Sequence, residues 1–186
     1  PSFFYFTKKE FLKNSEKILS KIKILFKDNK IIVRSSSTEE DQLNNSNAGK
    51  FKSFKNLKTY DKKLKLIILD VIKDFKKSED QVIIQKFISK PDVSGVIFTR
   101  NINNNSPYYF LNLDSSGQTD LVTSGQSNPT MKTLVFFRNI KKYNFPNRFR
   151  ELINSIQYIE KYFQNDRLDL EFCIKNKKIY IFQCRP

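Results

Sequence analysis

The residues best suited to do chemistry lie at the C-terminal end of the chain, in the stretch RLDLEFCIKNKKIYIFQCRP. Two runs rich in Ile, Leu, Phe and Tyr flank the polar segment Asn176-Lys177-Lys178, a pattern that predicts a β-hairpin. The alternation favours a register in which Glu171 faces Gln183 and Asp169 faces Arg185. Carboxylate and amide oxygens suit Mg²⁺, and a guanidinium can hold phosphate oxygens bidentately. The open end of the hairpin is therefore a candidate site for a hard cation and a phosphate.

The same register predicts how the rest of the hairpin is used. Phe172 would face Phe182, and the turn would have an odd length, three residues with a bulge. One face would then be nearly all apolar, formed by Leu168, Leu170, Phe172, Ile174, Tyr180, Phe182 and Cys184. A plainer alternative is a surface salt bridge between Asp169 and Arg185, since exposed cross-strand ion pairs are common and weak. On the hairpin alone, that alternative is favoured.

Composition indicates a globular protein with one domain or two small lobes. The chain has 186 residues, of which 39% are hydrophobic and 28% charged, enough to bury a core. A net charge of +15 would suit a polyanionic partner, either nucleic acid or the phosphates of a nucleotide. The lysines are spread along the chain among many Asn and Ile residues, as an AT-rich coding sequence produces. We therefore give the charge little weight as a sign of nucleic-acid binding.

Several features are missing from the sequence, and each excludes a class of protein or mechanism. It contains no run of about 18 apolar residues and no signal-peptide pattern, so we expect no membrane partner. Cys173 and Cys184 should lie on opposite faces of the hairpin and stay unpaired, which indicates a reducing, cytoplasmic setting. There is no histidine, so no step here uses an imidazole. Because the chain begins at Pro1, without a methionine, and stops at Arg185-Pro186, we expect it to be part of a longer protein.

The N-terminal part predicts a helix followed by a strand. Thr7 and Glu10 have the spacing of a capping box, and a second helical pattern continues from Ile18 towards Asp28. A short strand, residues 31–33, then runs straight into Arg34 and the hydroxyl-rich stretch SSSTEED. Small hydroxyl residues behind an arginine can present donors to an anion, or can form a solvated turn with a helix cap.

The rest of the chain predicts hairpins punctuated by helices. An amphipathic helix starts at Asp61, and residues 81–88 and 93–99 read as a hairpin. Strands at 108–113 and 132–137 precede a helix over 147–163, which should turn inward Phe149, Leu152, Ile153, Ile156, Ile159 and Phe163. This order favours an α+β fold over a doubly wound parallel sheet.

Four separated stretches resemble, in order, the ATP-binding domain of the phosphoenolpyruvate synthase and pyruvate phosphate dikinase family. VRSSSTEED followed by NAGKFKSF is similar to the family's VRSSAxAED and FAGQ. VIIQKFISKPDVSGVIFTRN is similar to VQxMV and AGVxFTxNP, and SSGQTDLVTSGQSNP to GLGExVVxGxxxP. DLEFCIKNKKIYIFQCRP matches DIEW followed by QxRP. The opening PSFFYFTKKEFL also resembles the family's PPGFxxTxxAY, so the likeness spans nearly the whole chain.

This resemblance implies an ATP-grasp fold of two lobes, with mainly antiparallel sheets and flanking helices, meeting near residues 85–90. Residues 1–186 would be one nucleotide-binding domain without its N-terminal part. The family carries a glycine-and-lysine segment there, so a phosphate-binding lysine would be missing. In the loop expected over 114–120, Asp120 stands where the family has Glu, and Gln118-Thr119 replace Leu-Gly.

The resemblance also assigns roles to individual residues. Arg34 would bind ATP phosphates, while Glu171 and Gln183 would hold the Mg²⁺ that bridges them. Asp169 would contact the ribose and Arg185 would support the phosphates. Asp120 would lie on the phosphate side, and backbone groups would line the adenine slot at Gln85, Lys86, Phe87 and Ile88.

The function implied is that of an ATP-dependent phosphotransferase module. Family members pass phosphate from ATP to a histidine on a separate swivelling domain and then to an acceptor such as pyruvate or an amino-acid amide, releasing AMP and phosphate. Without histidine, this chain would supply only nucleotide binding, in partnership with phosphohistidine and acceptor-binding domains of the same polypeptide. Two alternatives stay open: a non-catalytic nucleotide-binding module and, with less support, a basic nucleic-acid-binding domain.

Overall fold

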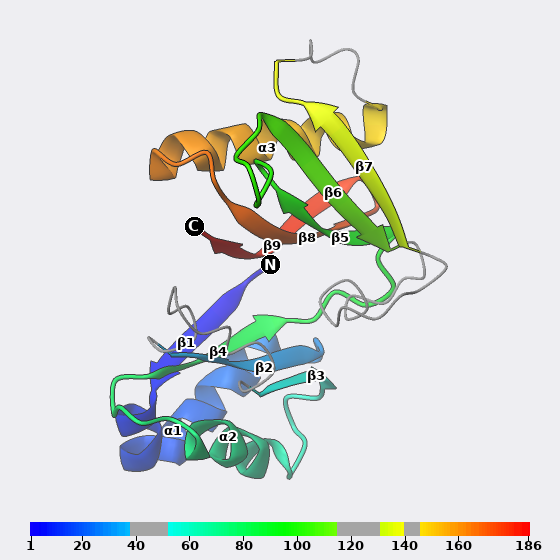
Figure 1. Ribbon diagram of the computed structural model, residues 1–186. Helices are drawn as coiled ribbons and strands as arrows, with labels where there is room; N and C mark the ends of the chain where they lie inside the picture. Colours follow the sequence, from blue (N-terminus) through cyan, green and yellow to red (C-terminus); the bar gives the residue numbers. More distant parts are fainter. Residues whose placement is uncertain (38–51, 115–130, 140–145) are drawn as a thin grey trace. The chain divides into compact units, whose positions relative to one another are not determined.

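The computed structural model describes residues 1–37, 52–114, 131–139 and 146–186, and the chain folds into two compact units (Figure 1). The first unit is Pro1–Ile88 and the second is Ser89–Pro186. Each contains one antiparallel sheet, covered on one face by two described helices in the first unit and by one in the second, so the α+β class expected from the sequence is confirmed. Within the described residues, no helix is long and apolar enough to cross a membrane.

The first unit is a four-stranded antiparallel sheet in the order β1-β4-β2-β3. Its strands are β1 (Phe3–Thr7), β2 (Ile31–Ser36), β3 (Ser53–Leu57) and β4 (Gln81–Lys86), and its helices are α1 (Lys8–Phe26) and α2 (Leu64–Lys73). Both helices lie on the same face of this sheet (Figure 1). The core between sheet and helices contains Phe6, Phe11, Ile22, Ile31, Val33, Ile68, Val82 and Ile84. Burial of one such side chain contributes about 2 kcal/mol.

Helix α1 begins as the sequence predicts. The Thr7 hydroxyl accepts from the Glu10 N–H at 3.1 Å and the Glu10 carboxylate accepts from the Thr7 N–H at 2.7 Å, which completes a capping box. The two helical patterns expected here form one helix with a kink at Asn14, whose φ and ψ of −142° and 47° are not helical. The apolar stripe predicted from Asp61 onward is also buried, although α2 itself begins at Leu64.

The second unit is a five-stranded antiparallel sheet in the order β7-β6-β5-β8-β9. Its elements are β5 (Val93–Phe98), β6 (Tyr108–Asp114), β7 (Met131–Phe137), α3 (Asn147–Phe163), β8 (Asp169–Lys175) and β9 (Lys178–Arg185). Helix α3 covers one face (Figure 1) and contributes Phe149, Leu152, Ile153 and Ile156 to the core. Phe163, which was expected to face inward, is 57% exposed at the last turn, so that part of the prediction is wrong.

Residues 81–88 and 93–99 do not form the hairpin predicted from the sequence. Strand β4 pairs with β1 and β2, whereas β5 pairs with β6 and β8 in the other unit. Each run is a central strand, so both of its edges are already used by other strands. The burial of five consecutive residues from Val93 to Ile97 fits a central strand better than one arm of an isolated hairpin. Gly95 is required there because a Cβ would lie 2.4 Å from the Asn112 carbonyl oxygen.

Candidate functional site

The acidic residues of β8 point away from the helix-covered core of the second unit. Leu170, Phe172 and Ile174 pack against α3. Because side chains alternate along a strand, Asp169 and Glu171 lie on the opposite face of the sheet, called here the open face. Both carboxylates are half-buried.

Strand β9 supplies the partners expected from the sequence. Glu171 is directly opposite Gln183, and Asp169 is directly opposite Arg185. The register predicted for the open end of the hairpin is confirmed. Two carboxylates, one amide and one guanidinium therefore occupy two neighbouring rows of the open face.

The register changes beyond this point, and the rest of the hairpin prediction is wrong. A bulge follows Glu171, so Phe172 faces Ile181 and not Phe182. The turn has two residues, Asn176 and Lys177, with φ of 51° and 62°, the positive values that two-residue hairpin turns need. The bulge turns Ile179 and Ile181 towards the core, where they pack beside Cys184. A bulge away from the turn lets both strands keep apolar side chains inside and polar side chains out.

The open face continues across the central strands. The row that contains Gln183 and Glu171 continues through Val96 and Asn112 to Thr133. The Thr133 hydroxyl donates to the Asn112 side-chain oxygen at 2.8 Å, which orients that amide. Sequence reasoning missed Asn112, although the alternation in YFLNLD places it between two inward leucines.

Two further polar residues on this face are almost fully buried. Ser94 and Asp114 are paired across β5 and β6 and are 1% and 0% exposed. The sequence predicted a loop from Asp114 onward, but Asp114 is the last residue of β6. Asp120, the expected phosphate-side residue, lies outside the described residues.

In the first unit, Arg34 lies within β2 and not behind it. Ile31 and Val33 face the helices, so Ile32 and Arg34 lie on the other face of this sheet. Arg34 pairs with Ile83 on one side and with Ser53 on the other. The strand predicted from the sequence ended at Val33, because the polar, hydroxyl-rich stretch that follows is typical of a turn. Pairing with β4 extends it to Ser36.

Gln85 shares this face with Arg34. It pairs with Ile32 on β2 and with Phe3 on β1, so it is the diagonal neighbour of Arg34, about 7–8 Å away between backbones. Its side chain is 6% exposed, and among the described residues its Oε1 atom has no hydrogen-bond partner. An unsatisfied buried acceptor costs about 1–3 kcal/mol, so a ligand that donates to Gln85 would remove a penalty.

The segment after Gln85 is held from both sides. The Lys86 N–H donates to the Ser2 carbonyl at 3.0 Å, and the Phe87 N–H donates to the Lys30 carbonyl at 2.9 Å. The side chain of Ile88 is 6% exposed. These contacts hold the backbone of the segment expected to line the adenine slot. The N–H groups of Lys86 and Phe87 already donate to backbone carbonyls within the chain.

A partly buried ion-pair network lies at the end of the second sheet. Arg138 makes two hydrogen bonds to Glu160, at 2.6 and 3.0 Å, and its guanidinium lies 4.6 Å from the Tyr109 ring centre. Arg100 pairs with Asp166 at 2.5 Å, and its hydrogen bond lowers the pKa of Asp166. Burial, followed by the charge of Glu160, raises the pKa of Tyr109. All acidic and basic groups of this network have partners, so we assign it a structural role.

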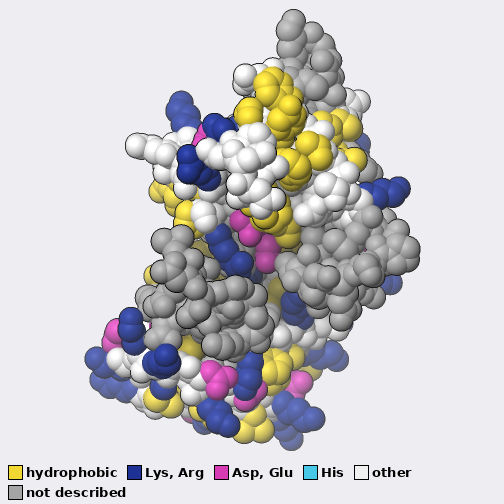
Figure 2. Space-filling model, viewed as in Figure 1, with side chains coloured by type: hydrophobic (Ala, Val, Ile, Leu, Met, Phe, Trp, Pro, Cys, Tyr) yellow, Lys and Arg dark blue, Asp and Glu magenta, His cyan; other side chains and the backbone are white. Residues whose placement is uncertain are grey.

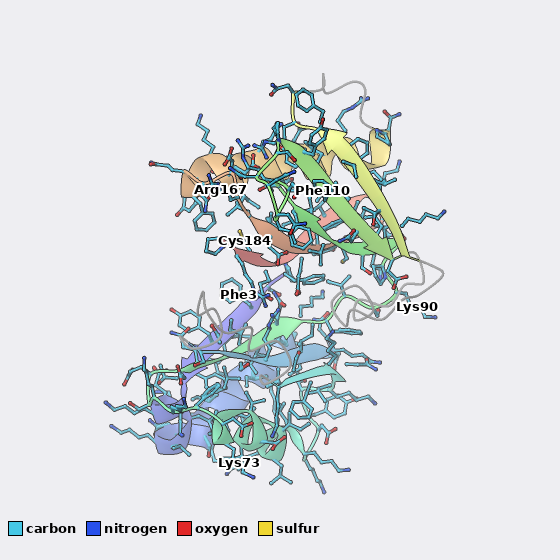
Figure 3. All side chains as sticks on the ribbon, in the orientation of Figure 1. Phe3, Lys73, Lys90, Phe110, Arg167 and Cys184 are labelled. Atoms are coloured by element: carbon cyan, nitrogen blue, oxygen red, sulfur yellow. The ribbon has the colours of Figure 1, made fainter. Side chains whose placement is uncertain are left out.

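Burial disfavours the thiolate form of both cysteines. Cys173 and Cys184 are both free, as predicted, and Cys184 lies on β9 (Figure 3). Burial raises the pKa of Cys173 to about 12 and also raises the pKa of Cys184. Cys184 packs against the core, whereas Cys173 alternates with core residues and lies on the other face. The two cysteines therefore lie on opposite faces of the hairpin, as the sequence predicted.

The donors available to a metal ion are few. Within the described ranges, no three His, Cys, Asp or Glu side chains are close enough to hold a metal. Glu171 and Gln183 offer two oxygen ligands, which fits a cation whose other ligands come from substrate and water. Mg²⁺ bound to nucleotide phosphates has this kind of shell.

On the visible face of the molecule, the basic side chains of the described residues do not gather in one patch. On the face shown in Figure 2, Lys and Arg side chains are scattered among acidic, polar and hydrophobic ones over the described surface. Nucleic-acid-binding proteins instead cluster such charges on one face or stripe. The visible distribution gives no support to the nucleic-acid alternative.

The amino-acid sequence resembles a known enzyme over part of its length. No family model matches the chain. It is 31% identical over 98 residues to pyruvate, phosphate dikinase from Rickettsia conorii, a match that covers 53% of this chain and 11% of that enzyme.

Solved structures show the fold more completely. D-alanine–D-alanine ligase from Helicobacter pylori aligns over 100% of this chain and 48% of its own, with a TM-score of 0.52 and 13% identity. The ATP complex of the Bacillus anthracis ligase aligns over 100% of this chain and 48% of its own, with a TM-score of 0.50 and 15% identity. The chain spans about half the length of these ligases. The ATP-grasp fold expected from the sequence is thereby confirmed.

Proposed function

We propose that this chain is the ATP-binding module of a phosphotransferase of the phosphoenolpyruvate synthase and pyruvate phosphate dikinase type, and that it is one part of a longer polypeptide. The observation that carries the proposal is the pairing of Glu171 with Gln183 and of Asp169 with Arg185 on the open face of an ATP-grasp fold. The 98-residue match to a dikinase supports this choice over a ligase. The ATP complex of a ligase with the same fold supports ATP as the nucleotide.

Glu171 and Gln183 would hold Mg²⁺ against the phosphates of ATP. Their opposed positions supply a charged and a neutral oxygen, and phosphate oxygens and water would complete the shell. The metal would supply neutralisation of the charge that develops on the transferred phosphoryl group. Asp169, next along the same face, would accept hydrogen bonds from the ribose.

Arg34 and Arg185 would bind phosphate oxygens directly. A guanidinium stays charged at all working pH values and holds phosphate through two parallel hydrogen bonds. Gln85 to Ile88 would line the adenine slot, where the buried Oε1 of Gln85 needs a donor. Asp120 would act on the phosphate side. Phosphoryl transfer depends mainly on such positioning and electrostatic stabilisation, so no nucleophile of this chain is required.

The phosphoryl group would leave this module. The chain has no histidine, so the phosphorylated residue of the proposed reaction has to lie on a separate swivelling domain. A further domain would bind the acceptor, such as pyruvate or an amino-acid amide, with AMP and phosphate released. The proposed setting is the cytoplasm.

The test is a calorimetric titration of the chain with Mg-ATP. Arg34→Ala should weaken binding about 10- to 100-fold, the loss of one charge-assisted hydrogen-bonding group. Lys17→Ala, an equal charge change on an exposed position of α1, should leave affinity unchanged. Equal loss in both variants would reduce the effect to net charge and contradict the proposal.

A second measurement tests the division of labour. The chain incubated with ATP labelled in its transferable phosphate should acquire no acid-labile label, because phosphohistidine cannot form. Labelling of this chain alone would contradict the separate-histidine scheme, even where nucleotide binding is confirmed.

A further inference from the structure

Thr99 directly follows β5 and continues its pairing with the segment before β8 in an unusual way. Phe98 pairs with Asp169, so Thr99 faces Leu168 in the continued register. The Thr99 N–H donates to the Leu168 carbonyl at 2.9 Å, but the Leu168 N–H donates to the Thr99 hydroxyl at 2.8 Å. In a regular antiparallel pair, that N–H would donate to the Thr99 carbonyl. The side-chain oxygen has therefore replaced a backbone carbonyl in the ladder.

The carbonyl that is released has another partner. It accepts from Arg138 Nη1 at 2.7 Å, and the Thr99 hydroxyl donates to the Asp166 carbonyl at 2.7 Å. Every hydrogen-bonding group of Thr99 is thus used, and the residue is 0% exposed. Arg138 is itself fixed by Glu160. Thr99 therefore links three segments: the end of β5, the residue that follows β7, and the connection from α3 to β8.

This junction lies directly before the acidic residues of β8. A one-residue slip of the strand would turn Asp169 and Glu171 from the open face to the α3 face. We propose that Thr99 is a positioning residue for these two carboxylates: its hydroxyl fixes the start and register of β8 and so their placement towards Mg-ATP. This inference rests on the proposed function for the identity of the ligand.

Three substitutions separate positioning from general stability. Thr99→Val keeps the shape but removes the hydroxyl, so the Leu168 N–H can regain an acceptor only by taking the Thr99 carbonyl from Arg138. Thr99→Ser keeps the hydroxyl and should behave like the wild type. Ile156→Val removes a methylene from the same core, at a residue that is 0% exposed, without touching a hydrogen bond of β8.

The experiment combines calorimetry with amide hydrogen exchange on the whole chain. Thr99→Val should weaken Mg-ATP binding about tenfold, as loss of a group supporting metal ligands does. Exchange should accelerate at residues 168–171 in this variant alone. Thr99→Ser and Ile156→Val should keep wild-type Mg-ATP affinity. If Thr99→Val does not fold, Thr99→Cys, with its weakly hydrogen-bonding thiol, takes its place.

Mg-ATP affinity in Thr99→Val equal to that in Ile156→Val, with unchanged exchange at residues 168–171, would overturn the inference. A wild-type chain that binds no Mg-ATP would instead contradict the proposed function. In that case, hydrogen exchange by itself tests whether Thr99 positions β8. Faster exchange at residues 168–171 in Thr99→Val supports this role, and unchanged exchange overturns it.

Discussion

Glu171 and Gln183 stand directly opposite each other on β8 and β9, and the strand register shifts immediately beyond them. The bulge separates two stretches with different tasks. On one side, the polar rows of the open face keep their pairing, and on the other, Ile179 and Ile181 turn into the core. The same hairpin therefore combines the proposed cation ligands at its open end with hydrophobic core residues near its turn.

Glu171→Gln should remove most of the Mg²⁺ dependence of ATP binding. The substitution keeps the shape of the side chain but removes the only charged ligand of the proposed pair. We expect the ratio of affinities with and without Mg²⁺ to fall more than the roughly tenfold typical of a supporting group. Calorimetry in Mg²⁺ and in EDTA measures this ratio. Glu151→Gln, on an exposed position of α3, is the matched control, and an equal effect there would refute a metal-binding role.

Gln85→Leu should weaken ATP binding without destabilising the fold. Because Gln85 Oε1 is buried without a partner among the described residues, an apolar side chain of similar size should leave the melting temperature unchanged or raise it. ATP affinity should fall, since the ligand loses its hydrogen bond. Thermal unfolding and calorimetry on the same sample test both statements. A lower melting temperature with wild-type affinity would mean that Gln85 only supports the sheet.

Arg138→Met should destabilise the second unit strongly. It leaves the Glu160 carboxylate, 8% exposed, without its bidentate partner, and breaking a buried pair costs about 3 kcal/mol or more. Urea denaturation measures the loss. Lys65→Met breaks the ion pair between Lys65 and Glu16, whose side chains are 45% and 81% exposed, and should cost far less because solvent screens exposed pairs. Similar costs for the two substitutions would show that the network is not buried in solution.

The ion pair of Arg100 with Asp166 should make stability depend on pH in the acid range. The hydrogen bond from Arg100 lowers the pKa of Asp166 below its ordinary value of 3.8. A lowered carboxyl pKa contributes stability above the unfolded value, and that contribution is lost as pH falls through the folded one. Asp166→Asn should therefore lower the melting temperature at neutral pH, and this difference should shrink as the pH falls below 3.8. A constant difference across this range would contradict the assignment.

Local pattern predicted the elements that depend on neighbours in the chain. The Thr7–Glu10 capping box, the core stripe of α2 and the bounds of α3 each follow from side chains within a few residues of one another. Long-range pairing was predictable only where alternation was strict, as in the opposition of Glu171 and Gln183. The predicted pairing of residues 81–88 with residues 93–99 was wrong. Their proximity in sequence favours a hairpin, but β4 pairs with β1 and β2, and β5 pairs with β6 and β8.

The sequence by itself determined the residue types of the candidate site, the α+β class and the resemblance that pointed to the ATP-grasp fold. Tertiary structure decided what depends on distant partners. It placed Arg34 inside a strand beside Gln85, moved the hairpin bulge from the turn to Phe182, and joined Thr99 to Arg138 and Leu168. Such contacts are set by packing against segments far along the chain, so no local pattern encodes them.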